Sequence, residues 1–207
     1  MKGKFITFEG CEGSGKSTQI RFLAEYLKDK GVDFILTREP GGSLVAEKIR
    51  SVILDKENEA MTGECEALLY AAARVQHLDE IVKPALEAGK LVICDRYVDS
   101  SLAYQGYARG LGFAFIENIN SYALKQFQPD LTLFLNISPK SAFERKHGAD
   151  LNDRMERLGL AFHENVYKGY LQLLEKYPRI CAVECGGTKY ETAEKIKNIL
   201  FDNNIIK

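Results

Sequence analysis

The sequence has no long apolar run and almost no net charge. No stretch approaches the roughly 18 consecutive apolar residues of a membrane-spanning helix. The short apolar run behind the first lysines ends at Glu9, too early for a secretory signal. Lysine and arginine number 28 against 29 aspartates and glutamates, so nothing indicates a surface that grips a nucleic-acid polymer or an anionic membrane. We therefore expect a soluble, cytoplasmic protein whose partners are small molecules.

Cysteine pairs, repeats and linkers are also missing. The five cysteines are odd in number and scattered without a C-x-x-C pair, which is typical of reduced cytosolic thiols and not of a disulfide framework or a zinc site. The three histidines lack ligand spacing, so we interpret them as surface or packing residues. No repeat or low-complexity tract divides the 207 residues, and this length favours a single domain over residues 1–207.

Short runs rich in β-branched and aromatic residues alternate with longer segments of helical period. The runs cover residues 5–8, 33–37, 91–94, 131–137 and 180–183. Because parallel strands need a crossover connection and a helix usually supplies it, this alternation predicts an α/β fold with a parallel sheet.

Apolar spacing predicts the helices. They follow Lys16 and cover residues 65–89, 113–127, 162–177 and 192–201. Pro84 should bend or interrupt the helix over residues 65–89, because proline has no N–H to donate. Ser138 suits the N-cap of a helix that starts at Pro139. That helix leads into the charged residues 144–157, which we interpret as a mobile flap, with a solvated charged loop as the alternative.

The stretch GCEGSGKST matches the phosphate-binding pattern G-x-x-x-x-G-K-[ST], with a predicted strand before it and an amphipathic helix after it. Its glycines let successive backbone N–H groups converge on phosphate oxygens, and the following helix N-terminus adds positive charge. We expect Lys16 to bridge the β- and γ-phosphates and Ser17 to ligate Mg²⁺. The residues assigned to the nucleotide are Gly10, Cys11, Glu12, Gly13, Ser14, Gly15, Lys16, Ser17 and Thr18.

This loop predicts an ATP or GTP site but not its use, since switches, motors, transporters and kinases share it. A second polar pair, Asp95-Arg96, ends the strand over residues 91–94, at the sheet edge where ligands of open α/β folds bind. Asp95 suits a contact with a Mg²⁺-bound water, and Arg96 suits a bidentate contact with an acceptor phosphate. The alternative is an exposed salt bridge between the two.

Four stretches together resemble the thymidylate kinases, P-loop enzymes that phosphorylate dTMP with ATP. Beside the phosphate loop they are TREPGG at 37–42, LLYAAARVQH at 68–77 and DRYVDSSLAYQG at 95–106, in the same order as in that family. The flap and FHENVYKGYLQL also resemble the family's lid and the helix behind it. The resemblance implies a three-layer P-loop kinase fold with about five parallel strands and a lid near residues 144–157. It also implies dTMP kinase activity in dTTP synthesis, Mg²⁺ and a homodimer.

The resemblance also implies an acceptor site. Arg96 would hold the dTMP phosphate in line with the γ-phosphate, and Arg38 and Glu39 would support that corner. The thymidine-facing residues are Tyr70, Arg74, Ser101, Tyr104 and Gln105. Tyr70 would stack on thymine, where the family usually has phenylalanine, while Arg74 hydrogen-bonds a thymine carbonyl. Both lie on one helix face at i, i+4, although core packing is the alternative for Tyr70.

An acid inside the phosphate loop needs its own explanation. Some family members carry an arginine in this loop and others supply it from the lid; this chain has no arginine between Gly10 and Ser17. Its flap holds the cations Arg145, Lys146, Arg154 and Arg157. We expect Arg154 and Arg145 to stabilise the transferring phosphoryl group. Glu12 would then face the acceptor 3′-hydroxyl or a Mg²⁺-bound water.

Two rival functions stay open. One is a P-loop kinase for a nucleoside or for another nucleotide, which would share every feature of the phosphate loop. The other is a nucleotide-hydrolysing switch or a regulatory binding module, which needs no acceptor pocket. The three stretches outside the loop favour the kinase, because neither a switch nor a module requires them.

Overall fold

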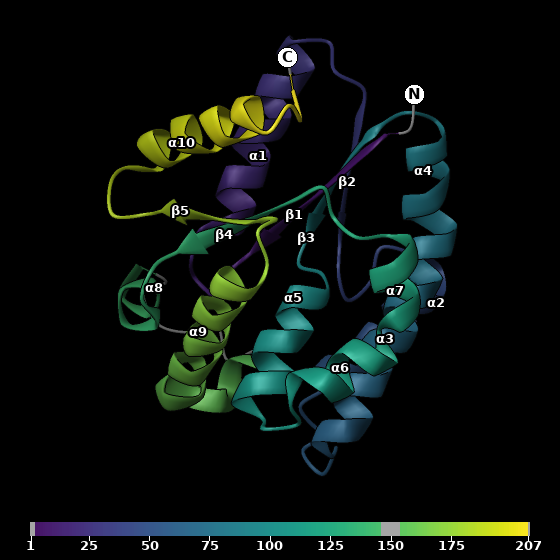
Figure 1. Cartoon of the computed structure of the whole chain (residues 1–207). Coiled ribbons are helices and arrows are strands. Elements are labelled where there is room, and N and C mark those ends of the chain that lie inside the picture. The colour runs from purple at the N-terminus through teal and green to yellow at the C-terminus, as the bar shows by residue number, and fades with distance from the viewer. Residues whose placement is uncertain (1–2, 146–153, 207) are drawn as a thin grey trace.

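A computed structural model describes residues 3–145 and 154–206 (Figure 1). Five parallel strands form one sheet in the order β2-β3-β1-β4-β5. They are β1 (Lys4–Glu9), β2 (Phe34–Arg38), β3 (Leu91–Asp95), β4 (Leu131–Asn136) and β5 (Ile180–Glu184). All five predicted strands are confirmed to within a residue at each end, and the α/β fold with them.

One face of the sheet is covered by α1 (Lys16–Asp29) and α10 (Lys189–Asp202) (Figure 1). Leu27 of α1 and Leu200 of α10 are buried there with Ile6 and other alternate strand side chains. Successive strand residues point to opposite faces, and nearly every residue of β1 and β3 is buried, as expected for a parallel sheet between two helical layers. Among the described residues, no helix has both the length and the apolar character needed to cross a membrane.

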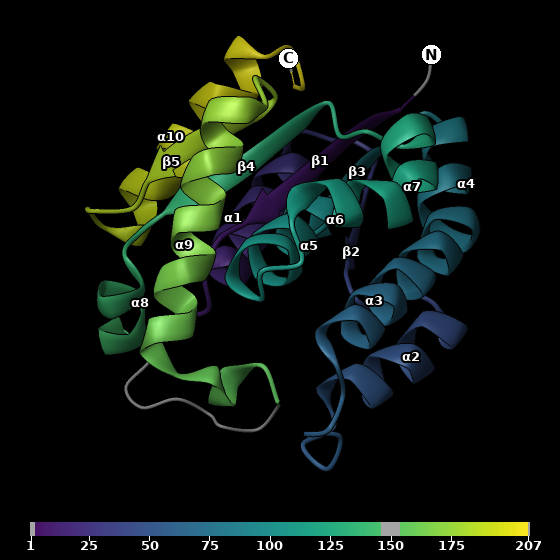
Figure 2. The same ribbon diagram turned by 60° about the horizontal axis from the view of Figure 1, so that its bottom comes forward.

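The other face carries more helices and the larger apolar core (Figure 2). They are α3 (Gly63–His77), α4 (Lys83–Glu87), α5 (Val98–Ser101), α6 (Phe113–Ile119), α7 (Ser121–Gln126) and α9 (Gly159–Lys176). Outside this layer, α2 (Leu44–Leu54) packs on α3, and α8 (Pro139–Arg145) packs on α9. The sheet therefore lies between two helical layers.

The predicted helix over residues 65–89 is interrupted, as expected, but one turn ahead of Pro84. There α3 passes into the π-helical η1 (Leu78–Val82), in which the N–H of Lys83 donates to the Leu78 carbonyl, and then into α4. Pro84 has no N–H and its ring crowds the preceding turn. The wider π-helical turn accommodates the proline ring, and the helical segment continues into α4.

The prediction of one helix over residues 113–127 was wrong. The chain breaks at Asn120 between α6 and α7, with φ −102° and ψ 14° there. The buried Asn120 amide donates to the Ile116 carbonyl and accepts from Arg74, so a tertiary contact fixes a residue that has low helix propensity.

The helices around the flap start at recognisable caps. Ser138 is the N-cap of α8, since its Oγ accepts from the Ser141 N–H at 3.2 Å. A capping box of Thr188 and Glu191 starts α10. Of the predicted flap, Arg145 ends α8 and the short 3₁₀-helix η3 (Glu156–Leu158) lies beyond; residues 146–153, Lys146 included, lie outside the described residues.

A buried ion pair ties the helical layer to the sheet. Asp99 of α5 receives two hydrogen bonds of 2.7 Å from Arg179, which precedes β5. Arg179 Nη1 also donates to the Thr132 hydroxyl of β4 at 2.7 Å, and this hydroxyl forms a hydrogen bond with that of Thr7 in β1. The pair therefore connects α5 to three neighbouring elements.

Arg179→Ala should destabilise the fold strongly, because it leaves the Asp99 carboxylate buried without its cation. Breaking a buried pair from one side costs about 3–5 kcal/mol, and we expect the free energy of unfolding to fall by that amount. The matched control Arg21→Ala breaks an exposed pair with Glu25 and should cost less than about 1 kcal/mol. Urea denaturation measures both losses. Equal losses in the two variants would contradict the role of the buried pair.

Candidate active site at the carboxyl edge of the sheet

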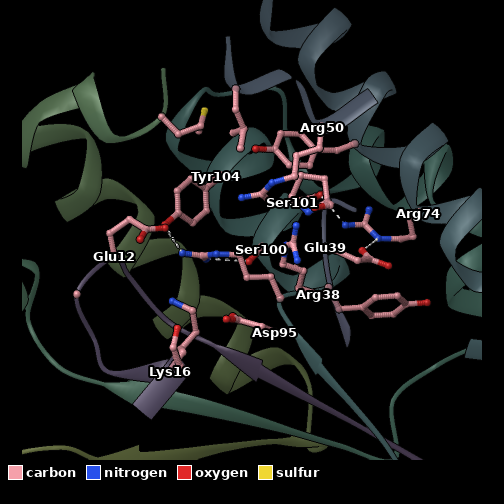
Figure 3. Close-up of a pocket in the computed structure, with 18 of the residues that line it drawn as sticks. Glu12, Lys16, Arg38, Glu39, Arg50, Arg74, Asp95, Ser100, Ser101 and Tyr104 are labelled. Atoms are coloured by element: carbon pink, nitrogen blue, oxygen red, sulfur yellow. Dashed lines mark hydrogen bonds and ion pairs between the residues drawn. The ribbon is translucent and has the colours of Figure 1, made fainter. Parts of the chain in front are cut away.

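The carboxyl ends of β1, β2 and β3 open onto a cleft of about 510 Å³ (Figure 3). Most predicted site residues line it: Glu12, Gly13, Gly15, Lys16, Ser17, Thr18, Arg38, Glu39, Tyr70, Arg74, Asp95, Arg96, Ser101, Tyr104, Gln105 and Arg145. The others, Gly10, Cys11, Ser14 and Arg154, are buried and do not line it. The cleft thus brings the phosphate loop together with cationic and aromatic side chains.

The phosphate loop connects β1 to α1, and contacts with Lys16 and with α8 fix its conformation. Lys16 is buried, and its ammonium group donates to the carbonyls of Gly10 and Cys11 at 3.1 and 3.2 Å. Burial and the nearby Arg96 charge lower the pKa of Lys16. Gly13 has φ 75°, and a Cβ there would lie 2.5 Å from the Ala142 carbonyl oxygen. The loop therefore needs glycine both for its backbone and for its contact with α8.

Arg96 is the most constrained cation of the cleft. It follows β3 with φ 70°, a left-handed conformation that is costly for a residue with a side chain and that recurs at functional sites. Its Nη1 donates to the Gly10 carbonyl and to Ser100 Oγ, both at 3.1 Å, and its Nη2 pairs with the Glu12 carboxylate (Figure 3). The guanidinium also lies over the Tyr104 ring, 5.2 Å from its centre.

Glu9 lies buried behind Arg96, and sequence reasoning missed it. Its carboxylate accepts from the Tyr97 N–H at 2.7 Å and from the hydroxyls of Ser100 and Tyr170 at 2.6 and 2.8 Å. Burial, and then the charge of Asp99, raises the pKa of Glu9 to about 7. The signal for it was an acid that ends an otherwise apolar strand directly before the loop.

Asp95 has an unused acceptor. Its Oδ1 is buried and receives no hydrogen bond from any described residue. Figure 3 shows Asp95 beside Lys16, and the exposed Ser17 also lines the cleft. A carboxylate oxygen without a donor and a serine hydroxyl are ligand types that fit a hard divalent cation.

At the opposite end of the cleft, buried Arg74 is held on three sides. Its Nε donates to Glu39 at 2.6 Å, its Nη1 to Asn120 and its Nη2 to Ser101 at 3.2 Å. Glu39 also accepts from, or shares a proton with, His77 Nδ1 at 2.9 Å. Glu39 therefore lies beside Arg74. Sequence reasoning missed Asn120 because its partner is 46 residues away.

Two other arginines line the cleft from the β2–α2 side. Arg38 is exposed and pairs with Glu47 of α2 at 2.9 Å. Arg50 of α2 donates to the Pro40 carbonyl at 2.8 Å, and no sequence motif pointed to it. Tyr70 of α3 is half-buried at the same cleft.

The two flap arginines lie in different places. Arg145 lines the cleft, and its Nη2 donates to the Cys185 carbonyl at 2.8 Å. Arg154 is buried away from the cleft, where it pairs with Glu66 and donates to the Ile53 carbonyl at 3.0 Å. The structure brings Arg145 to the cleft but does not bring Arg154 there.

Glu39, His77 and Cys94 form a buried cluster whose ligand atoms lie within 4.8 Å of one another. Histidine spacing in the sequence gave no sign of it. Its groups are already engaged, because Glu39 pairs with Arg74, and His77 Nε2 shares a hydrogen bond of 2.6 Å with Thr37. Burial raises the pKa of Cys94 well above the ordinary value, which disfavours a metal-binding thiolate. We interpret the cluster as a hydrogen-bond network.

Comparison with known proteins extends over nearly the whole chain. A sequence model of the family described as "Thymidylate kinase" matches residues 8–196. The chain is 48% identical to a thymidylate kinase of Clostridium novyi over 202 residues, or 96% of the chain and 98% of that protein. It is 46% identical to one of Finegoldia magna over 98% of the chain and 100% of that protein. With one of Oceanobacillus iheyensis it shares 54% identity over 86% of the chain and 80% of that protein.

Stability should respond to pH through Glu9. Its pKa is about 7 in the folded protein against an ordinary value of 4.5, so its contribution to stability is fully present below pH 4.5 and is lost as pH rises through 7. Relative to Glu9→Gln, the wild type should lose up to about 3 kcal/mol between pH 4.5 and about 7.5. Urea unfolding of both proteins in metal-free buffer measures this difference. Parallel pH profiles would show that Glu9 titrates normally.

Proposed function

Because the chain belongs to the thymidylate kinase family, we propose that its cleft transfers the γ-phosphoryl group of ATP to dTMP, giving dTDP and ADP for dTTP synthesis. The family consists of phosphotransferases that use ATP as the donor, and the chain is one of them. The observation that carries the assignment is that Arg96, Arg74, Tyr70 and Tyr104 line the same cleft as the phosphate loop. A hydrolytic switch would need no such set of acceptor-binding residues.

At the donor end, Lys16 binds the β- and γ-phosphates, with loop N–H groups from Gly10 to Thr18 around them. Its two bonds to loop carbonyls hold the ammonium group in place until phosphate oxygens replace them. Ser17 and, through water, Asp95 would hold Mg²⁺, which fits the unused Oδ1 of Asp95. The bound ion would neutralise charge on the bridging phosphate oxygens.

Arg96 binds the acceptor phosphate, with its left-handed backbone and its bonds to Gly10 and Ser100 fixing the guanidinium. An acceptor dianion competes with Glu12 for the same Nη2 edge. Its binding frees the Glu12 carboxylate to accept from the sugar 3′-hydroxyl or from a Mg²⁺-bound water. Arg38, at the cleft wall, adds positive charge to this corner. A phosphate oxygen is already nucleophilic, so positioning and charge stabilisation are the main tasks.

The thymidine moiety occupies the opposite end. Tyr70 stacks on the base, and Tyr104 packs against the deoxyribose. Arg74 hydrogen-bonds a thymine carbonyl, while Glu39 holds its guanidinium from behind and Ser101 accepts from it. Gln105 reaches the base from the π-helical η2 (Leu102–Ala108). Ser101 ends α5, and Tyr104 and Gln105 lie on η2.

We assign the charged residues 144–157 to a lid on a single domain over residues 1–207. Arg145 is the cation that supports the transferring phosphoryl group, because it lines the cleft. Arg154 anchors the far end of the segment to α2 and α3.

A homodimer and a cytoplasmic location complete the proposal. Val45 and Val52 of α2 and Leu68 and Val75 of α3 are exposed although apolar, and each pair is spaced seven residues apart on one helix face. Because α2 and α3 pack side by side, these side chains form one surface, which a second copy of the chain would cover. All five cysteines are free, which supports a reducing compartment.

The proposal is tested by ADP release across nucleoside monophosphates at saturating ATP, with and without Mg²⁺. We expect dTMP to exceed dUMP modestly and UMP strongly, and dCMP and purine monophosphates to be poor acceptors. Lys16→Ala should abolish transfer while the fold stays intact, because among the described residues the hydrogen bonds of its ammonium group go to two loop carbonyls. Equal use of UMP or dCMP would instead indicate a broader pyrimidine monophosphate kinase. ATP binding without any response to monophosphates would indicate a switch or a binding module.

The two flap arginines should separate in kinetics. Arg145→Ala should lower kcat at least about tenfold with little change in either KM, because its contact with the phosphoryl group forms mainly in the transition state. Arg154→Ala should lower the melting temperature and leave the Glu66 carboxylate short of a donor. Steady-state kinetics and thermal unfolding of both variants decide this. A kcat loss confined to Arg154→Ala would return the catalytic role to that residue.

A further inference from the structure

Glu66 of α3 is a buried acid for which the cleft has no direct use. It is fully buried and does not line the cleft. Its Oε1 accepts from Gln105 Nε2 at 2.8 Å and from Arg109 Nε at 2.7 Å. Its Oε2 accepts from Arg109 Nη2 at 2.8 Å and from Arg154. The Glu66 carboxylate therefore accepts hydrogen bonds from three side chains that are distant from it in sequence, Gln105, Arg109 and Arg154.

The charge state of Glu66 decides what it can do. Burial alone would raise its pKa, but the hydrogen bonds from Arg109 and Gln105 outweigh burial, and the pKa is lowered. An ionised carboxylate only accepts hydrogen bonds. Arg109 and Arg154 only donate, so they too point their N–H groups at Glu66. A flipped Gln105 amide would place its Oε1 lone pairs against those of the carboxylate.

The orientation of the Gln105 amide follows from this. Its Nε2 is committed to Glu66, so Oε1 occupies the other side of the amide. Gln105 lines the cleft, and no donor among the residues in 3–145 and 154–206 reaches its Oε1. The group that the side chain can offer to a ligand is therefore an acceptor.

Resting on the proposed function, we propose that Glu66 is a positioning residue for base selection, because it fixes the Gln105 amide with Oε1 toward the acceptor base. Thymine and uracil carry a donor N3–H on their pairing edge, which Oε1 can accept. Cytosine carries an unprotonated N3 at the same place, and two acceptors would face each other there. With cytosine bound, the Gln105 Oε1 would be left without a donor, and the cost of this unpaired polar group makes the site select against cytosine.

A purely structural role for Glu66 would lead to a different effect on the acceptors. As the counter-ion of Arg109 and Arg154, it would support the packing of η2 and of the flap end against α3. Loss of that support would weaken all acceptors alike. Only the contact with Gln105 connects Glu66 to the distinction between thymine and cytosine.

The test is the ratio of kcat/KM for dTMP to that for dCMP in Glu66→Gln. We expect this ratio to fall at least about tenfold, through a higher KM for dTMP and better use of dCMP, with the KM for ATP unchanged. The matched control Arg109→Gln removes one charge from the same cluster but keeps the Glu66 contact with Gln105. It should lower the melting temperature and leave the ratio within about twofold of the wild type.

The second test is the double variant Glu66→Gln with Gln105→Glu, which exchanges the two side chains and conserves the net charge. The amide introduced at position 66 can donate to the carboxylate introduced at position 105, which still offers an acceptor oxygen to the base and still neutralises the two arginines. We expect the swap to restore a strong preference for dTMP, and it decides the question alone if Glu66→Gln does not fold. An unchanged ratio in Glu66→Gln, equal losses in Arg109→Gln, or a swap that fails to fold or to restore the preference would overturn the proposal.

The wild type separates this proposal from the proposed function. A wild-type chain that uses dCMP as well as dTMP would refute the assigned acceptor itself. A wild type that prefers dTMP, together with a Glu66→Gln variant that keeps the preference, would refute only the role of Glu66.

Discussion

Buried carboxylates fix the positions of several arginines in this fold, and one of these, Arg74, lines the cleft. An ionised carboxylate away from water costs several kcal/mol unless donors surround it. Glu39 holds Arg74, Asp99 holds Arg179 under the sheet edge, and Glu66 holds the far end of the flap. Glu9 differs, because hydroxyl and backbone groups surround it and its proton affinity is raised. The guanidinium of Arg74, which lines the cleft, is thus held in place before a ligand binds.

The sheet supplies the other half of this arrangement. In the order β2-β3-β1, three neighbouring parallel strands deliver the TREP stretch, Asp95-Arg96 and the phosphate loop to one edge. The pairing of Phe8 with Asp95, and of Asp95 with Arg38, sets these groups side by side. Donor and acceptor pockets therefore share one wall, and their separation depends on strand spacing and not on flexible loops.

Local chemistry made much of this predictable. Strand bounds and the phosphate loop follow from short-range patterns, because glycine spacing, β-branched runs and a helix N-terminus act within a few residues. The predicted residues of the acceptor side came instead from the resemblance to the thymidylate kinases. Pairings across the chain were not predictable in this way. Arg154 is a cation in a charged segment, and nothing local shows that Glu66, 88 residues away, holds it. Glu39 follows Arg38 in sequence but turns to Arg74, and Asn120 breaks a helix whose apolar pattern runs on.

The left-handed backbone of Arg96 has a consequence for how this site tolerates change. At such a φ, glycine or asparagine would relieve local strain of about 1–3 kcal/mol, so the backbone and the chemistry favour different residues at one position. Replacements there can make the fold more robust while removing the guanidinium that phosphate needs. The hydrogen bonds of Arg96 to Gly10 and Ser100 offset that strain. Substitutions at Gly10 or Ser100 are therefore restrained by the need to hold Arg96. Stability and turnover are opposing demands at this corner, and selection for one alone would move the chain away from the other.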